Sequence, residues 1–217
     1  MISIVLGSTG AVGRELIQFL TSSSKYSKIL LPLRNPLPEW EKMPENQKSK
    51  EEITQILEEE KIDSFFNCLG SVTAKGEEEL RKVDKEYAID SAELCEKLSI
   101  EHYSIISSRG SSINSCILYL RVKAEAEEEI LKKNVKFIDI FQPGLIKGRA
   151  NARCGEKLMG CCCCCCYPSI HVKELAKGIM MFDLNIHNRD REDSNFKDSY
   201  RRRVSNDEIL NVVKNEK

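Results

Sequence analysis

Two side chains with types and spacing suited to proton transfer, Tyr119 and Lys123, lie near the middle of the sequence. Residues four apart share one face of a helix, so a helix here places the phenol beside the ammonium. A nearby ammonium favours the phenolate and lowers the tyrosine pKa toward a value useful for acid–base chemistry. The pair follows Ser107-Ser108, where a hydroxyl can bind a substrate carbonyl. In a chain with six tyrosines and many lysines such a pair also arises by chance, so its position carries the weight.

A glycine motif near the amino terminus has the spacing that phosphate binding requires. It follows a short apolar run and opens an amphipathic helical pattern. Glycines at this spacing permit a tight turn, close approach of the backbone to a phosphate, and close packing of helix on strand. The free N–H groups of the helix start add a partial positive charge. The motif therefore predicts a dinucleotide-binding loop made of Gly7, Ser8, Thr9, Gly10, Ala11, Val12 and Gly13.

Arg34 distinguishes between the two nicotinamide dinucleotides. It lies 21 residues after Gly13, at the end of the second predicted strand, where an NAD-binding fold usually has Asp or Glu. A guanidinium binds a 2′-phosphate through two hydrogen bonds, whereas a carboxylate repels it. The sequence therefore favours NADP(H). The alternative is a solvated arginine at a strand end.

Short apolar runs alternate with helical patterns up to about residue 148, and this alternation predicts the fold. Strands are expected at residues 2–6, 28–33, 64–68, 103–106 and 135–141. Helices are expected at 13–20, 51–61, 75–98 and 117–132, with Tyr87 and Leu94 among the inward positions of the third. Such alternation forms right-handed crossovers in a parallel sheet. We expect an α/β, doubly wound Rossmann fold of one domain, residues 1–217.

The pattern changes in the last third of the chain. A helix is predicted at 172–181, then a polar stretch to Ser199, a strand at 200–204 and a final helix. Ser205 and Glu208 form a capping box in front of that helix. Residues 149–217 are predicted to form a small C-terminal cap that shapes the substrate region.

Composition excludes several classes of protein. The 217 residues carry 33 basic and 34 acidic side chains, which argues against a general nucleic-acid binder. No apolar run reaches the roughly 18 to 20 residues of a membrane span, and the start does not read as a signal peptide. Six of the ten cysteines are consecutive, Cys161 to Cys166, and the rest are scattered. This is no disulfide framework, so we expect reduced thiols and a cytoplasmic location.

The motifs together resemble the short-chain dehydrogenase/reductase superfamily. The resemblance rests on the glycine motif, the Ser107-Ser108 pair, Tyr119-x-x-x-Lys123 and Gln142-Pro143-Gly144. Further stretches are similar to the atypical branch that contains the Tat-interacting oxidoreductase and lies close to the NmrA-like proteins. They are residues 66–71, 83–94 and 118–124.

This resemblance implies roles by position. Leu69 and Gly70 would line the adenosine half of the cofactor, and Pro143 would flank the nicotinamide. Tyr119 would be the acid/base, and Lys123 would bind the nicotinamide ribose. Ser107 or Ser108 would orient the substrate carbonyl, and we prefer Ser108. The implied activity is NADP(H)-dependent oxidation or reduction of an unidentified carbonyl or hydroxyl compound.

One departure leaves other functions open. Many superfamily members have an Asn in the helix after the third strand to complete a proton relay, and the nearest equivalent here is Asp84. The rival function is a regulatory NADP(H) sensor that presents a surface to a protein partner. A degenerate fold without cofactor is a third alternative.

Several features are predicted to carry little chemistry. Cys161–Cys166 is interpreted as a surface low-complexity tract, with metal binding or S-acylation as alternatives. Arg201–Arg203 is expected on a solvated strand edge, and Glu125–Glu129 on an exposed helix face. His102 and His187 have no partner that the sequence identifies, and no metal ligands are assigned.

Overall fold

The computed structural model describes residues 1–32, 57, 59–71, 76–149, 167–192 and 199–215. A six-stranded sheet with the order β2-β1-β3-β4-β5-β8 forms its centre, and all neighbouring strands are parallel. Its strands are β1 (Ile2–Leu6), β2 (Lys28–Leu30), β3 (Ser64–Asn67), β4 (His102–Ile106), β5 (Phe137–Gln142) and β8 (Tyr200–Ser205). The predicted doubly wound α/β fold is confirmed.

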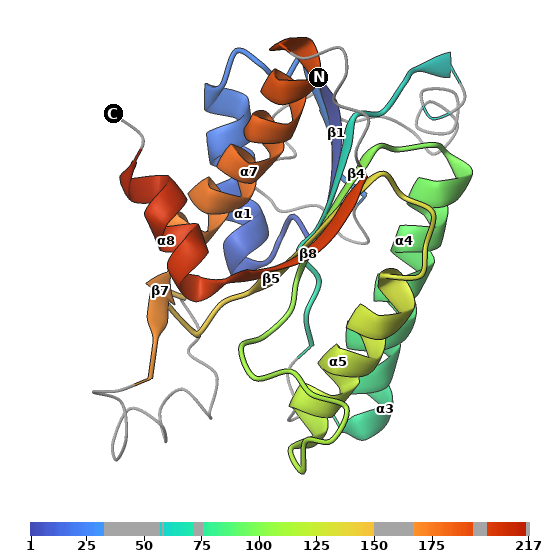
Figure 1. Cartoon of the computed structure of the whole chain (residues 1–217), viewed down its shortest axis with the longest axis vertical. Helices are drawn as coiled ribbons and strands as arrows, with labels where there is room; N and C mark the ends of the chain where they lie inside the picture. Colours follow the sequence, from blue (N-terminus) through green and yellow to red (C-terminus); the bar gives the residue numbers. More distant parts are fainter. Residues whose placement is uncertain (33–56, 58, 72–75, 150–166, 193–198, 216–217) are drawn as a thin grey trace.

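Helices cover both faces of this sheet (Figure 1). On one face lie α1 (Ala11–Ser22), α7 (Val172–Glu192) and α8 (Asn206–Lys214). On the other lie α3 (Glu77–Arg81), the π-helical segment η3 (Lys82–Glu86), α4 (Tyr87–Lys97) and α5 (Leu118–Ile130). A separate pair of parallel strands, β6 (Leu145–Lys147) and β7 (Ser169–His171), lies below α8 in this view.

Burial on both faces explains why the strands are continuously apolar. Neighbouring residues of a strand point to opposite faces, so each face needs its own apolar set. Phe66 belongs to the core beneath α1 and α7, whereas Phe65 belongs to the core beneath α4 and α5. In β5 the same division separates Phe141 from Ile140.

The predicted helix at 75–98 is present over Glu77–Lys97, but a π-helical turn interrupts it. Tyr87 and Leu94, expected to point inward, are 40% and 38% exposed. The extra residue of a π turn rotates the face that the following helix presents to the core, so these two predictions were wrong. Such turns often mark functional positions in helices.

The last third of the chain contributes to the main sheet as well as to the helices. β8 pairs with β5, and α8 begins at the predicted capping box, where Ser205 and Glu208 exchange hydrogen bonds. α7 continues to Glu192, so the predicted end of this helix at residue 181 was wrong. The cap over residues 149–217 stays a prediction, because residues 150–166 and 193–198 lie outside the described parts. Among the described residues, no helix is long and apolar enough to cross a membrane.

Candidate functional site

The glycine loop lies where β1 ends and α1 begins, beside the end of β3. Gly7 has a φ of +80°, and a Cβ on it would come within 2.8 Å of the Leu69 backbone nitrogen. A Cβ on Gly13 would come within 2.4 Å of the Gly7 carbonyl oxygen. Any larger residue would therefore push β3 away from the loop at one position, and α1 away from it at the other.

The start of α1 is open to an anion. Gly10 is its N-cap residue and supplies no side chain to the first N–H groups. Thr9 is exposed, whereas Ser8 is fully buried and its hydroxyl has no hydrogen-bond partner among the described residues. An uncapped helix start preceded by Gly7 and Gly10 suits a pyrophosphate, which would accept hydrogen bonds from the free N–H groups.

A second loop, after β3, lies against the glycine loop. Asn67 is buried, and its side-chain oxygen accepts a hydrogen bond from the Leu69 N–H at 3.0 Å. Its amide nitrogen donates to Ser91 at 2.9 Å. Asn67 thus fixes the path of the chain toward Gly70. The backbone of Leu69 thereby lies against Gly7 of the glycine loop.

Lys123 lies in a buried ion pair with Asp84. Its Nζ is 2.8 Å from Asp84 Oδ1 and also donates to the Ile106 carbonyl at 2.9 Å. Asp84 Oδ2 accepts hydrogen bonds from the Ser71 N–H and hydroxyl, at 2.9 and 2.6 Å. Burial alone would raise the pKa of Asp84, but the attraction of Lys123 and the hydrogen bonds together hold it below its ordinary value. The pair therefore joins η3 to α5 and to the end of β4.

Tyr119 lies one helical turn before Lys123, in the first turn of α5, and is half-buried. Among the described residues its hydroxyl makes no hydrogen bond, so it is available to a ligand. Pro143 follows β5, and its carbonyl accepts a hydrogen bond from the Arg109 N–H at 2.9 Å. This bond joins the chain after β5 to the loop after β4. The structure thus gathers Tyr119, Lys123 and Pro143 near the carboxyl ends of β4 and β5.

The two candidate serines differ in what their hydroxyls bind. Ser107 is buried and donates to Glu127. Ser108 is half-buried, and its hydroxyl reaches only the Arg109 carbonyl, at 3.4 Å. The Ser107 hydroxyl is thus committed to the protein, which supports the preference for Ser108 as the residue that orients a substrate.

Glu127 is a residue that the sequence analysis misassigned. It was expected on an exposed helix face, but it is only 2% exposed. Besides Ser107, it accepts hydrogen bonds from Gln142 at 3.0 Å and from Arg203 at 2.7 Å. Its position four residues after Lys123 was the available signal, because that spacing puts both on the inward face of α5. Glu127 holds the carboxyl ends of β4, β5 and β8 together.

The remaining residues singled out in the sequence are Arg34, the cysteine run, the arginines of β8 and Cys68. Arg34 and Cys161–Cys166 lie outside the described residues. β8 is an edge strand as expected, but Arg202 and Arg203 form ion pairs with Asp139 and Glu127 instead of being free in solvent. Burial raises the pKa of the Cys68 thiol to about 12, so the cysteine beside the glycine loop stays protonated at neutral pH.

No protein-family model matches this chain. It is similar to the protein HTATIP2 of Rattus norvegicus, with 31% identity over 166 residues, 71% of this chain and 66% of the rat protein. It is also similar to the protein FMP52-1, mitochondrial, of Scheffersomyces stipitis, with 30% identity over 162 residues, 71% of each chain. The chain thus spans about two thirds of the length of these relatives.

Solved structures resemble the fold at low identity. MoeE5 in complex with UDP-glucuronic acid and NAD superposes with a TM-score of 0.66 at 12% identity, over 94% of this chain and 76% of that one. The UDP-N-acetylglucosamine 4-epimerase of Bacillus cereus gives a TM-score of 0.66 at 12% identity, over 97% and 83%. These likenesses show a Rossmann fold and say nothing of the substrate.

Proposed function

Because this chain belongs to the family of HTATIP2 and FMP52, in the atypical branch of the short-chain dehydrogenase/reductase superfamily, we propose that it is an NADP(H)-dependent oxidoreductase. Its substrate would be a carbonyl or hydroxyl compound. The observation that carries this proposal is the convergence of an uncapped helix start, a free tyrosine hydroxyl and a buried lysine at one edge of the sheet.

The glycine loop would hold the cofactor. Gly7 and Gly13 allow the loop to pack closely against the chain after β3 and against α1, and Gly10 starts α1 without a side-chain cap. The first N–H groups of α1 would donate hydrogen bonds to the pyrophosphate. Leu69 and Gly70 would lie along the adenosine half. When bound, a nicotinamide dinucleotide supplies or accepts the hydride.

The chain's own residues would handle the proton and the substrate oxygen. Ser108 would donate a hydrogen bond to the substrate oxygen and orient it beside Tyr119. In the reductive direction the Tyr119 hydroxyl would give its proton to that oxygen, and in the oxidative direction it would take the proton back. Lys123 would place positive charge near the tyrosine and the cofactor ribose, although Asp84 already engages its ammonium.

The preference for NADP(H) over NAD(H) rests on the sequence alone. Arg34 is suited to bind the 2′-phosphate, and no carboxylate at that position competes. This preference remains part of the proposal.

An NADP(H) sensor with little turnover is the second candidate, and one observation favours it. In the superfamily's relay a neutral amide takes part, but here Asp84 binds Lys123 in a closed, buried ion pair. Because the carboxylate compensates its positive charge, a lysine held in this way stabilises negative charge on neighbouring groups less. A sensor would keep the cofactor loop and present a surface to a protein partner.

Calorimetric titration with NADPH and NADH, followed by a panel of aldehydes, ketones and quinones, tests the proposal. The oxidoreductase proposal expects NADPH to bind more tightly than NADH and at least one compound to be reduced at the expense of NADPH. Binding without turnover across the panel supports the sensor instead. Absence of binding by either dinucleotide contradicts both.

For location, the sequence favours the cytoplasm, and we propose that compartment. The FMP52 relatives carry the word mitochondrial in their names. Fractionation of cells that express the tagged full-length protein decides between the two compartments, since enrichment with mitochondrial markers would contradict the cytoplasmic proposal.

A further inference from the structure

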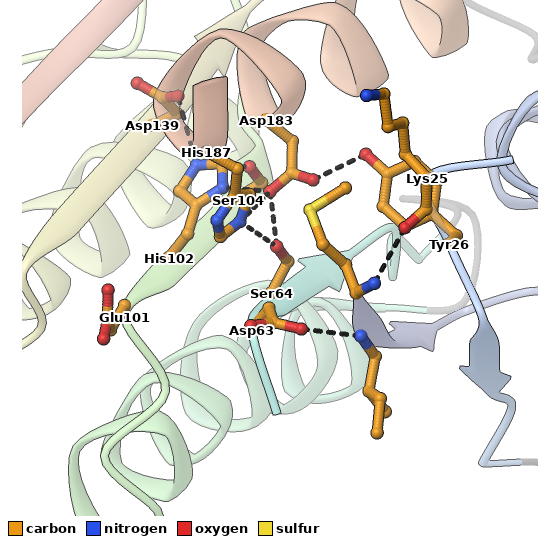
Figure 2. A network of polar contacts seen from close by, with 12 residues as sticks. Lys25, Tyr26, Asp63, Ser64, Glu101, His102, Ser104, Asp139, Asp183 and His187 are labelled. Carbon is orange, nitrogen blue, oxygen red and sulfur yellow. Dashed lines mark hydrogen bonds and ion pairs between the residues drawn. The ribbon is translucent and has the colours of Figure 1, made fainter. Parts of the chain in front are cut away.

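A buried polar cluster lies at the amino edge of the sheet, opposite the glycine loop (Figure 2). Ser64 and His102 are the first residues of β3 and β4 and lie side by side in register. Asp183 and His187, one turn apart on α7, point toward them. We infer that His102, Asp183 and His187 form a binding site for one divalent transition-metal ion, with zinc as the favoured metal.

The positions of the three side chains suit a single ion. One potential ligand atom from each lies within 4.8 Å of the others. His102 Nδ1 is 2.6 Å from Asp183 Oδ1, and His187 Nε2 is 3.4 Å from the same oxygen. Zinc bonds of about 2.0 to 2.2 Å in a tetrahedral arrangement put neighbouring ligand atoms roughly 3.3 Å apart. Small side-chain adjustments would therefore admit the ion.

The type of ligand selects the class of metal. Two imidazoles and one carboxylate are donors for zinc and similar transition metals, whereas magnesium and calcium prefer sites made of oxygen ligands. The spacing of Asp183 and His187 places both donors on one helix face, as in helical metal motifs. The Ser64 hydroxyl, which donates to Asp183 Oδ1 and lies 2.9 Å from His187 Nε2, would lie next to a fourth ligand or a bound water.

A second carboxylate supports His102 from behind. His102 Nε2 is 3.2 Å from Asp139 Oδ2, and Arg202 Nε holds Asp139 through a contact of 2.5 Å. Metal-binding histidines commonly donate their other ring N–H to a carboxylate, which orients the ring and makes the ligand nitrogen more basic. Asp139 occupies that place here. This arrangement is independent of the cluster spacing and points to the same role.

The burial of the three side chains indicates how an ion would reach the cluster and which elements it would join. His102 and Asp183 are fully buried, while the His187 side chain is 13% exposed and lies at the opening of the cluster. An ion would enter past His187 and tie α7 to β3 and β4. The site lies at the other edge of the sheet from the cofactor loop, so we assign it a structural role that does not depend on the proposed redox function.

The cysteine run complicates a zinc titration, because six thiols offer competing ligands. The test therefore uses the full chain with Cys161–Cys166 replaced by serine, stripped of metal with EDTA and dialysed. Calorimetry with zinc chloride is expected to show one ion per chain, and melting in its presence is expected to occur at a higher temperature. Cobalt(II) is expected to give visible absorption bands without thiolate charge transfer.

Matched histidine variants decide whether this cluster is the site. In the same background His187→Ala is expected to weaken zinc binding at least 100-fold, because a ligand is lost. The control is His171→Ala, which removes the exposed histidine of β7 and is expected to leave binding unchanged. Asp139→Asn is expected to weaken binding 10- to 100-fold while keeping one ion per chain, the usual effect of losing a supporting carboxylate.

Circular dichroism of each variant establishes that it is folded before binding is measured. No zinc uptake by the serine-substituted chain overturns the inference. Uptake that His187→Ala leaves unchanged overturns it equally, since zinc then binds elsewhere. Loss of uptake in folded His187→Ala, with retention in His171→Ala, supports it.

Discussion

The polar groups at the two edges of the sheet differ in whether they have hydrogen-bond partners within the protein. At the carboxyl edge, α1 starts without a side-chain cap, and among the described residues the hydroxyls of Ser8 and Tyr119 have no partner. At the amino edge, both oxygens of Asp183 and both oxygens of Asp139 accept hydrogen bonds from the protein. The carboxyl edge thus keeps polar groups without a partner in the described residues, whereas at the amino edge of the metal-free chain the polar groups bind one another.

This difference reflects what each edge is for. In open parallel sheets, ligands bind outside the carboxyl ends of the strands, where the strand order reverses. Here β2 and β3 flank β1 on opposite sides, and the glycine loop follows β1. Groups left unpaired at that point can pair with a ligand. At the amino edge the hydrogen-bonded cluster joins α7 to the sheet, so changes there should affect stability more than cofactor binding or turnover.

The largest effect is expected from a pair of matched tyrosine variants. Tyr119→Phe removes the proposed proton donor and is expected to lower turnover by about 10²- to 10⁴-fold with little change in stability. Tyr26→Phe removes the hydroxyl that donates to Asp183 at 2.6 Å, at the amino edge. It is expected to lower the free energy of unfolding by about 1.5 to 3 kcal/mol and to leave turnover unchanged. Steady-state kinetics and urea unfolding of both variants measure this. Unchanged kcat in Tyr119→Phe would remove the catalytic role assigned to it.

The ion pair of the carboxyl edge gives the second prediction, because it is the exception to the comparison. Lys123→Met leaves the Asp84 carboxylate buried without its cation, which is expected to cost about 3 to 5 kcal/mol of stability. The double variant Lys123→Met/Asp84→Asn removes both charges and is expected to regain most of that loss. Urea unfolding gives both values. A cost below about 1 kcal/mol for Lys123→Met would mean that the pair contributes little to holding η3 against α5.

Arg34 gives the third prediction, which concerns cofactor choice. Arg34→Ala is expected to weaken NADPH binding by about tenfold to a hundredfold, since a charge-assisted hydrogen bond contributes about 1.5 to 3 kcal/mol. NADH binding should change little, because it has no 2′-phosphate. Calorimetric titration with both cofactors makes the comparison. Equal weakening of the two would reject the assignment of Arg34 to the phosphate.

Much of the carboxyl edge was predictable from the sequence, because local spacing encodes it. The glycine motif is a single run, Gly7 to Gly13, and Tyr119 and Lys123 lie on one helix. Neither prediction depended on contacts between distant parts of the chain. The ion pair between Lys123 and Asp84 was not predicted, since it joins two helices 39 residues apart through a π-helical turn that no sequence pattern announced.

The amino edge was missed for a different reason. His102 was recognised as a residue without an identified partner, and Asp183 and His187 fell in the polar stretch predicted after the helix at 172–181. Their partners come from β3, β4, β5 and α7, which meet only after the sheet has formed. The one available signal was the spacing of Asp183 and His187, which would have been informative had the helix been extended past residue 181.

The smallest expected effect is a pH dependence of stability that belongs to the amino edge alone. His102 is fully buried, and burial by itself would lower its pKa, but Asp139 and Asp183 raise it to about 9. Among the described residues, His187 and Tyr26 also contact Asp183, and Arg202 and Tyr200 also contact Asp139. A histidine with a raised pKa contributes stability that is complete below its unfolded value of about 6.5 and is lost as the pH rises through the folded value.

In the presence of EDTA, the free energy of unfolding should therefore fall between about pH 6.5 and 9, by at most about 1.4 kcal/mol per pH unit from this group. His102→Gln cannot take up that proton, so its unfolding free energy should be lower at pH 6 and should change less over the same range. The double variant Lys123→Met/Asp84→Asn, which leaves no unpaired charge, serves as the comparison from the other edge and should keep the wild-type slope. Urea unfolding at each pH measures the three slopes. Parallel profiles for wild type and His102→Gln would show that His102 keeps the same protonation state in the folded and unfolded chain, which would contradict a raised pKa of His102 beside Asp139 and Asp183.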